Sequence, residues 1–321
     1  MSNVALKHSS VNKIANRQVI SDALLEIGKN DKEIIVLTSD SRGSASMVKF
    51  GEELPQQIIE VGIAEQNIVG IASGLAHSGK KPFIASPACF LSMRSIEQIK
   101  VDVAYSNTNV KLIGISGGVS YGALGMSHHS LQDLAVTRAI PGLDVMMPAD
   151  RHEAKKMIEA LIDYDRPVYV RIGRNPVQDS YTSSDYHFEI GKSVTMKEGN
   201  DLTIFAIGET VRVALDSADA LQQKGINCRV INMHTIKPLD EEAIIRAAQE
   251  TGRIITMEEH SIYGGLGSAV VEVVSQHQPA PVKILGIPDE PAIAGKTAEV
   301  FEHYGLSVKN VTEIAIHMVN N

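Results

Sequence analysis

The chain has 321 residues, of which 44% are hydrophobic and 21% charged, and its formal net charge is −8. This length is sufficient for two domains with well-buried cores. The acidic balance, the aromatic content of 4% and the absence of tryptophan argue against a nucleic-acid partner.

The two cysteines, Cys89 and Cys228, lie far apart in the sequence. We therefore expect no disulfide framework and a reducing, cytoplasmic location. No apolar stretch approaches the roughly 20 residues that span a bilayer, and the first residues lack the apolar core of a signal peptide. A membrane partner is therefore not expected.

Apolar and amphipathic segments alternate along the first half of the chain. The run 33–38 is mostly apolar and is followed by polar Ser39, Asp40 and Ser41. Buried strands of parallel sheets have this pattern, and ligands collect at their carboxyl ends. The alternation predicts an α/β domain, a mostly parallel sheet with helices on both faces. The expected order is helix 13–28, strands 33–38 and 57–61, a helix ending near Gly79, strand 82–86, helix 90–105, strand 110–116, helix 131–139, strand 143–147, helix 150–163 and strand 167–172.

The segment 173–186 interrupts this alternation, because it is rich in Asn, Pro, Ser, Thr and Asp. We predict a first domain over residues 1–175, a linker over 176–190 and a smaller second α/β domain over 191–321. In the second domain we expect strands 202–206, 227–231, 253–257 and 282–285, and helices 210–224, 240–251, 264–276, 295–303 and 308–319.

One predicted helix begins at Glu65, shortly after Gly62. Apolar residues recur with helical spacing at 64, 68, 71, 72 and 75. Glu65 thus lies in the first turn, where a carboxylate complements the helix dipole. Gly70 and Gly74 share one face, which allows another backbone to approach closely. The spacing alone leaves Glu65 as either a structural or a functional acid.

Motifs for nucleotide binding are missing from the sequence. It contains no Walker-type loop and no GxGxxG after the first strand. The segment Gly264-Gly265-Leu266-Gly267 opens a predicted helix and could bind an anion through its free amides. Close packing of that helix is the favoured interpretation of its glycines.

Several segments, in order, resemble one family, the transketolases. The chain is most similar to the C-terminal half of transketolase, in the form found as a separate subunit where the enzyme is split into two polypeptides. The resemblance covers nearly the whole chain, and the order and spacing of its motifs are specific. The motifs are Val61-Gly62-Ile63-Ala64-Glu65-Gln66-Asn67, Phe90 with Ile96-Glu97-Gln98-Ile99, Gly125-x-Ser127-His128, Arg138-Ala139-Ile140-Pro141-Gly142, Pro148-x-Asp150, Pro167-Val168-Tyr169-Val170-Arg171-Ile172-Gly173-Arg174, Glu258-Glu259-His260 and Gly264-Gly265-Leu266-Gly267.

This resemblance implies a pyrimidine-binding domain of a thiamine-diphosphate enzyme, followed by the transketolase C-terminal domain. The family's diphosphate-binding domain carries a GDG…N motif that ligates Mg²⁺ or a similar ion, and the sequence contains no such motif. We therefore expect the metal and the diphosphate on a partner, the transketolase N-terminal subunit, and no metal ligands in this chain. An α2β2 assembly is also implied, with active sites between the two kinds of chain.

The resemblance assigns three residues to the cofactor. Glu65 matches the activating glutamate that hydrogen-bonds N1′ of the aminopyrimidine and helps its exocyclic nitrogen to remove a proton from C2. Phe90 matches the aromatic residue that stacks on this ring, with core packing as the alternative. Asp40 matches an aspartate near the cofactor, and turn capping is an equal explanation.

Four residues are assigned to the sugar phosphate in the same way. His128 is expected to be catalytic, because it would face the substrate and position its oxygen atoms; a structural loop histidine is the alternative. Arg17, Ser44 and Arg174 match positions that hold the terminal phosphate, for which a guanidinium group is well suited. Each arginine could instead be a solvated surface charge.

Three positions depart from the family pattern. Leu124 stands where many transketolases carry an aspartate that contacts a sugar hydroxyl, and Ser116 stands where some carry a phosphate-facing histidine. Pro87 replaces an aromatic residue of the cofactor wall. Because an isobutyl group offers no acceptor, Leu124 predicts a substrate that lacks this hydroxyl or carries it differently, such as a branched, deoxy or modified sugar phosphate.

The sequence therefore predicts a transketolase C-terminal subunit that moves a two-carbon ketol unit from a ketose phosphate to an aldose, and is active only with its partner. The beta subunit of a 2-oxoacid dehydrogenase decarboxylase and part of a deoxyxylulose-phosphate synthase are alternatives. The loop from Gly125 to His128 and Arg174 favour transketolase. A non-catalytic regulatory subunit is an alternative of another class, against which the presence of Glu65 argues.

Overall fold

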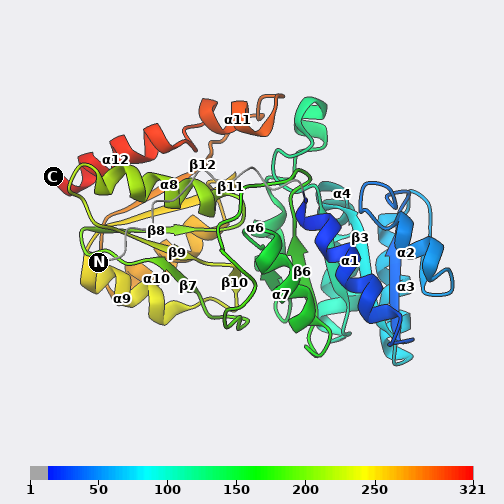
Figure 1. The fold of residues 1–321 in the computed structure, drawn as a ribbon. Helices are drawn as coiled ribbons and strands as arrows, with labels where there is room; N and C mark the ends of the chain where they lie inside the picture. Colours follow the sequence, from blue (N-terminus) through cyan, green and yellow to red (C-terminus); the bar gives the residue numbers. More distant parts are fainter. Residues whose placement is uncertain (1–13, 321) are drawn as a thin grey trace.

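A computed structural model describes residues 14–320 and contains two β-sheets, each flanked by helices (Figure 1). The first sheet has seven strands in the order β10-β5-β6-β4-β3-β1-β2. All of its neighbours are parallel except β10 and β5. Its strands are β1 (Ile34–Thr38), β2 (Ile58–Glu60), β3 (Lys81–Pro87), β4 (Lys111–Ile115), β5 (Asp144–Met146), β6 (Val168–Arg171) and β10 (Thr235–Lys237).

Both faces of the first sheet are buried, which explains its apolar strands. Leu37 and Ile84 pack in one hydrophobic cluster with residues of α3, whereas Val36 and Phe83 pack in another with residues of α1 and α7. The helices of this half are α1 (Asn16–Gly28), α2 (Val48–Glu53), α3 (Glu65–His77), α4 (Ala88–Arg94), α5 (Ile96–Gln98), the π-helix η1 (Ile99–Tyr105), the 3₁₀ helix η2 (Gly122–Ser127), α6 (Asp133–Arg138) and α7 (Arg151–Leu161).

The second sheet has five strands in the order β12-β11-β8-β9-β7, of which only β7 is antiparallel to its neighbour. The predicted fold class, two α/β domains with mostly parallel sheets, is confirmed. The elements of this half are β7 (Val194–Lys197), β8 (Leu202–Ala206), α8 (Thr210–Gln222), β9 (Cys228–Asn232), α9 (Glu241–Thr251), β11 (Ile254–Ser261), α10 (Leu266–His277), β12 (Val282–Ile287), α11 (Thr297–His303) and α12 (Val308–Asn320).

The two halves are joined by shared structure. β10 comes from the second half of the chain but pairs with β5 at the edge of the first sheet. Glu153 on α7 is buried and accepts hydrogen bonds from Asn232 on β9 and from Tyr181 in the connecting segment. Fully buried Arg171, on β6, lies 3.5 Å from the carboxylate of Glu259 on β11. The two sheets are thus tied together by hydrogen bonds and charge.

The single helix predicted over residues 90–105 is wrong. The structure divides this region into α4, α5 and η1, with a break at Ser95 (φ −113°, ψ 22°). The hydroxyl of Ser92 donates to the carbonyl of Ala88, and that of Ser95 donates to the carbonyl of Leu91. Hydroxyl groups that bond a carbonyl four residues earlier bend helices, which accounts for the break.

Four short elements were not predicted, namely α2, η2, β7 and β10. They have three to six residues each, which is too short for a recognisable period. Among residues 14–320, none of the helices is long and apolar enough to cross a membrane.

Candidate active site

Most of the predicted site residues follow the carboxyl ends of strands in the first sheet, whereas Arg17 lies on α1. Because neighbouring parallel strands end at the same edge, the segments that follow them meet there. Asp40 and Ser44 follow β1, Glu65 follows β2, Phe90 follows β3, Ser116 follows β4 and Arg174 follows β6.

Glu65 is the first residue of α3, and its side chain is only 5% exposed. Gly62 has a φ of +73°, which a glycine adopts without strain and which directs the chain from β2 into the helix. Arg94 Nη1 lies 3.2 Å from each Glu65 carboxylate oxygen. Both residues line a pocket of about 460 Å³ together with Ile63, Ala64, Gln66 and Asn67.

Phe90, on α4, is half-buried rather than a full core residue. The guanidinium carbon of Arg94 lies 4.1 Å from the centre of its ring, a cation–π contact. His128 meets the same ring edge-to-face, with 5.2 Å between ring centres. Phe90 therefore connects the Glu65 pocket with the loop that carries His128.

His128 follows η2 and lies between two aromatic rings. Its second aromatic contact is with Tyr121, 5.3 Å between ring centres at 70°. Its Nδ1 atom is 3.0 Å from Ser127 Oγ. The neighbouring His129 is buried and bonds to the carbonyl of Gly122. The two histidines thus point to different surroundings, as expected for adjacent loop residues.

Two arginines meet on the other side of Tyr121. Arg17 donates through Nε to the carbonyl of Arg174 (2.9 Å) and through Nη1 to the carbonyl of Ser44 (2.6 Å). Arg174 Nη1 lies 3.5 Å from Ser116 Oγ. Burial, followed by the charge of Arg174, lowers the pKa of Arg17.

The arginine pair has the electrostatic character of an anion site. Two guanidinium groups lie close together, and their described hydrogen bonds go to neutral oxygens. Within the part of the chain that the structure describes, neither Arg17 nor Arg174 forms an ion pair with a carboxylate. An anion with several oxygens would neutralise both charges.

Asp40 and Leu124 lie further from these contacts. Asp40 is exposed and has a left-handed backbone (φ 54°), and its N–H donates to Glu60 Oε1 at 2.6 Å. The turn is therefore held by Glu60, and a cofactor role for Asp40 stays a prediction. Leu124 lies on η2, and its side chain is 54% exposed.

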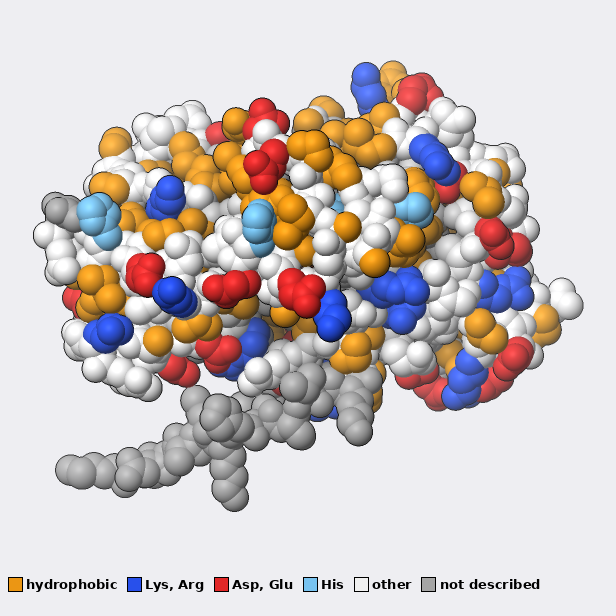
Figure 2. All heavy atoms as spheres, turned by 90° about the horizontal axis from the view of Figure 1, so that it is seen from above, with side chains coloured by type: hydrophobic (Ala, Val, Ile, Leu, Met, Phe, Trp, Pro, Cys, Tyr) orange, Lys and Arg blue, Asp and Glu red, His pale blue; other side chains and the backbone are white. Residues whose placement is uncertain are grey.

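The loop η2 projects at the top of Figure 1, beside α11. A Cβ added at Gly125 would lie 3.3 Å from the Cβ of Ala294, so the loop packs against the segment before α11. Figure 2 views the molecule from this side and shows hydrophobic side chains gathered near the middle of the face. Leu124 and Met126 both expose 40% or more of their surface, so η2 adds apolar area here.

Arg94 and Tyr121 were missed by the sequence reasoning. Arg94 is four residues after Phe90 on a helix, the spacing at which side chains meet, and this signal was available. Tyr121 lies in a glycine-rich loop without a period, so its contacts depend on how the loop folds.

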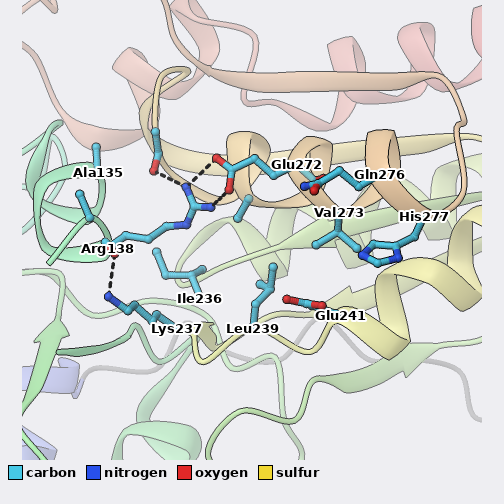
Figure 3. A pocket seen from close by; sticks show the side chains of 13 residues that line it. Ala135, Arg138, Ile236, Lys237, Leu239, Glu241, Glu272, Val273, Gln276 and His277 are labelled. Atoms are coloured by element: carbon cyan, nitrogen blue, oxygen red, sulfur yellow. Dashed lines mark hydrogen bonds and ion pairs between the residues drawn. The ribbon is translucent and has the colours of Figure 1, made fainter. Parts of the chain in front are cut away.

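A larger pocket of about 710 Å³ lies between α6, β10 and α10 (Figure 3). None of the predicted site residues lines it. Arg138 is paired there with the carboxylate of Glu272, and the Lys237 ammonium group donates to the carbonyls of Arg138 and Ile140. Within this pocket Arg138 is thus paired with a carboxylate and Lys237 with two backbone carbonyls.

Two family models match the chain: the pyrimidine binding domain of transketolase over residues 12–179, and the transketolase C-terminal domain over residues 191–311. The chain belongs to the transketolase family. The predicted resemblance and the transferase class are thereby confirmed. The transketolase family depends on thiamine diphosphate, so this transketolase chain is expected to contact that cofactor.

Separate subunits of split transketolases are similar to this transketolase chain along nearly their whole length. One of the subunits of an apulose-4-phosphate transketolase from Phocaeicola vulgatus is 52% identical over 308 residues, 96% of this chain and 98% of the relative. A 6-deoxy-6-sulfo-D-fructose transketolase subunit from a Clostridium species is 37% identical over 299 residues, 93% of this chain and 92% of the relative. A solved split gene transketolase, described as an inactive beta4 tetramer, superimposes with a TM-score of 0.88 at 36% identity, covering 96% of this chain and 99% of that one.

The side chains of this transketolase subunit fit one end of the cofactor. A largely buried carboxylate faces a pocket, and an aromatic ring lies beside it. These groups suit a flat, hydrogen-bonding ring, such as an aminopyrimidine. Among residues 14–320, no group of three or more His, Cys, Asp or Glu side chains is placed to hold a metal ion.

Proposed function

We propose that this chain is the pyrimidine-binding subunit of a two-chain transketolase that acts on a branched or otherwise modified ketose phosphate. The observation that carries the proposal is a continuous series of contacts that starts at Glu65, passes through Arg94, Phe90, His128 and Tyr121, and ends at Arg174. One end of this series offers a carboxylate and an aromatic ring, which suit the cofactor. The other end offers two guanidinium groups, which suit the phosphate of a sugar.

Each side chain has a distinct role in this proposal. Glu65 would hold N1′ of the aminopyrimidine by a hydrogen bond, and Phe90 would stack on that ring. His128 would hydrogen-bond a sugar oxygen close to the bond that breaks. Arg17 and Arg174 would hold the phosphate. Thiamine diphosphate supplies the electron sink for cleavage of the carbon–carbon bond.

The remaining parts of the site belong to a partner in this proposal. The transketolase N-terminal subunit would bind the diphosphate together with Mg²⁺ or a similar ion, and two copies of each chain would form an α2β2 enzyme. Relatives named as transketolase subunits support the two-chain arrangement. The proposed compartment is the cytoplasm, because Cys89 and Cys228 are both free, buried thiols.

Apulose 4-phosphate is the first candidate donor. Two observations support this choice. A relative of 52% identity carries this sugar in its name, and Leu124 offers no acceptor to a hydroxyl. Apulose is a branched ketose. Breaking its C2–C3 bond transfers the two-carbon ketol unit to the aldehyde carbon of an acceptor. The C3 hydroxyl loses its proton and becomes a carbonyl, so a three-carbon ketone phosphate is released, while the aldehyde oxygen of the acceptor gains a proton and becomes a hydroxyl.

The test uses the chain purified together with the N-terminal subunit, thiamine diphosphate and Mg²⁺. Apulose 4-phosphate and xylulose 5-phosphate are compared as donors, with ribose 5-phosphate as acceptor, and the products are identified by mass spectrometry. We expect kcat/KM to favour the branched donor by about tenfold or more, a ratio that shape discrimination can reach. A strong preference for xylulose 5-phosphate would contradict the proposed substrate. Release of CO₂ from pyruvate would instead support a 2-oxoacid decarboxylase or a deoxyxylulose-phosphate synthase.

A further inference from the structure

Tyr121 lies in the middle of the site, and the proposal above gives it no function of its own. Its ring meets His128 edge-to-face, with 5.3 Å between ring centres. The guanidinium carbon of Arg174 lies 5.2 Å from the centre of the same ring. The side chain of Ser116 lies beside the Tyr121 hydroxyl. One side chain therefore touches the histidine, the arginine and the serine that the resemblance assigns to the substrate.

We propose that Tyr121 is a specificity-determining positioning residue that fixes the separation between the phosphate end and the reacting end of the site. This inference rests on the proposed function, because it takes the arginine pair as the phosphate site. The ligand class is a ketose phosphate whose phosphate and carbonyl carbon are separated by a set number of atoms.

Ser116 is a firmly held neighbour of Tyr121. Ser116 is fully buried and has a φ of +55°, a backbone conformation that residues other than glycine rarely adopt. Strained residues of this kind persist where the surrounding structure holds them in place. Burial raises the pKa of Tyr121 above its ordinary value, so the hydroxyl keeps its proton at neutral pH.

The contacts of Tyr121 restrain two otherwise mobile side chains. Arg174 has a long side chain with several rotatable bonds, and the aromatic face limits its positions through the cation–π contact. The imidazole of His128 is confined between Phe90 and Tyr121 by two edge-to-face contacts. Tyr121 itself is half-buried, so it lies at the wall of the site and not in the core.

A coupling between the two ends follows from this arrangement. If an anion moves Arg174, the Tyr121 ring must respond, and His128 packs on that ring. Tyr121→Leu removes the ring and should uncouple the ends. Tyr121→Phe keeps the ring and removes only the hydroxyl beside Ser116. Tyr263→Leu is the matched control, because Tyr263 lies in the second half of the chain and is 60% exposed.

The first experiment titrates inorganic phosphate into the full chain carrying ¹³C-labelled histidine and follows the His128 resonance by NMR, assigned with His128→Gln. We expect phosphate to shift this resonance in the wild type and in Tyr263→Leu. In Tyr121→Leu, phosphate should still raise the melting temperature but should no longer shift His128. Tyr121→Phe keeps the ring and should therefore keep the shift.

The outcomes separate this inference from the proposed function. If phosphate shifts the His128 resonance in Tyr121→Leu as much as in the wild type, the positioning role of Tyr121 is overturned, while the phosphate site stays intact. A wild-type chain that binds no phosphate would overturn the phosphate site, and the inference with it.

The second experiment measures kcat/KM of the two-chain enzyme for xylulose 5-phosphate, fructose 6-phosphate and sedoheptulose 7-phosphate. These donors differ in the number of atoms between phosphate and carbonyl. The wild type and Tyr263→Leu should show a preference among the three lengths, and Tyr121→Leu should reduce that preference by about tenfold. An unchanged preference in Tyr121→Leu would contradict the inference.

Discussion

Arg94 Nη1 lies 3.2 Å from both carboxylate oxygens of Glu65, while the same guanidinium group covers the Phe90 ring at 4.1 Å. Arg94 thus makes the two contacts that the proposed function gives to the aminopyrimidine. A side chain and a ring cannot occupy the same place. We therefore expect the cofactor to displace Arg94 when it binds.

This displacement predicts that Arg94→Met strengthens thiamine diphosphate binding. Arg94 is 51% exposed, and an ion pair with one exposed partner contributes up to about 1 kcal/mol. The dissociation constant of the cofactor for the two-chain enzyme, measured by calorimetry, should fall by up to about fivefold. Arg94→Lys keeps the charge and should show a smaller change. Weaker cofactor binding in Arg94→Met would mean that Arg94 holds the cofactor and is not displaced by it.

Glu65→Gln tests the carboxylate itself. The amide keeps the size of the side chain but cannot share a proton with N1′, so turnover should fall by about 100-fold or more. The rate of ketol transfer by the two-chain enzyme gives the effect, and circular dichroism checks that the fold persists. Glu52→Gln, an exposed control on α2, should keep the wild-type rate. Near-normal turnover in Glu65→Gln would contradict the proposed role of the Glu65 carboxylate.

Arg174→Gln should selectively weaken the binding of phosphorylated donors. A lost charged hydrogen bond costs about 1.5–3 kcal/mol, which corresponds to a rise in KM of about 10- to 100-fold. Hydroxypyruvate carries no phosphate and donates a two-carbon unit with release of its carboxylate as CO₂, so the variant should use it as well as the wild type does. Arg174→Lys keeps the charge but loses the planar fork, so an intermediate KM is expected. Equal losses for both donors would indicate a general structural role.

Leu124→Asp should shift the donor preference toward ordinary ketose phosphates. The carboxylate restores an acceptor on an exposed position of η2, and a restored hydrogen bond changes the ratio of kcat/KM values by about tenfold. Met126→Asp is the matched control, because Met126 is another exposed apolar residue of the same loop. An equal shift in both variants would assign the effect to charge on the loop and not to position 124.

Much of the fold could be predicted from local patterns, and the site only in part. The wholly buried apolar runs of β1 and β4 have the pattern of parallel strands, and helical spacing placed Glu65 at the start of α3. The contacts of Arg94 and Tyr121 depend on how separate segments pack, which no local period encodes. The pairing of β10 with the first sheet is likewise a long-range contact of only three residues.

Glu153 links the pH of the solution to the stability of the chain. It is fully buried on α7, where both of its oxygens accept from Asn232 Nδ2, at 2.8 and 2.9 Å. Burial raises its pKa from the ordinary value of 4.5 to about 7. In the unfolded chain this carboxyl ionises above 4.5, whereas in the folded chain it keeps its proton until about pH 7. Its contribution to stability is therefore complete below 4.5 and is lost as the pH rises through 7.

Glu153→Gln isolates this contribution, because the amide does not titrate. Burial lowers the pKa of His234 and His260 to about 4, so these residues destabilise the fold as the pH falls, and the wild-type profile alone is a sum of opposing effects. The informative quantity is the free energy of unfolding of the wild type minus that of the variant, from urea titrations between about pH 5 and pH 8. This difference should fall by on the order of 2–3 kcal/mol across the range. A difference that does not change with pH would show that Glu153 is already ionised in the folded protein at pH 5.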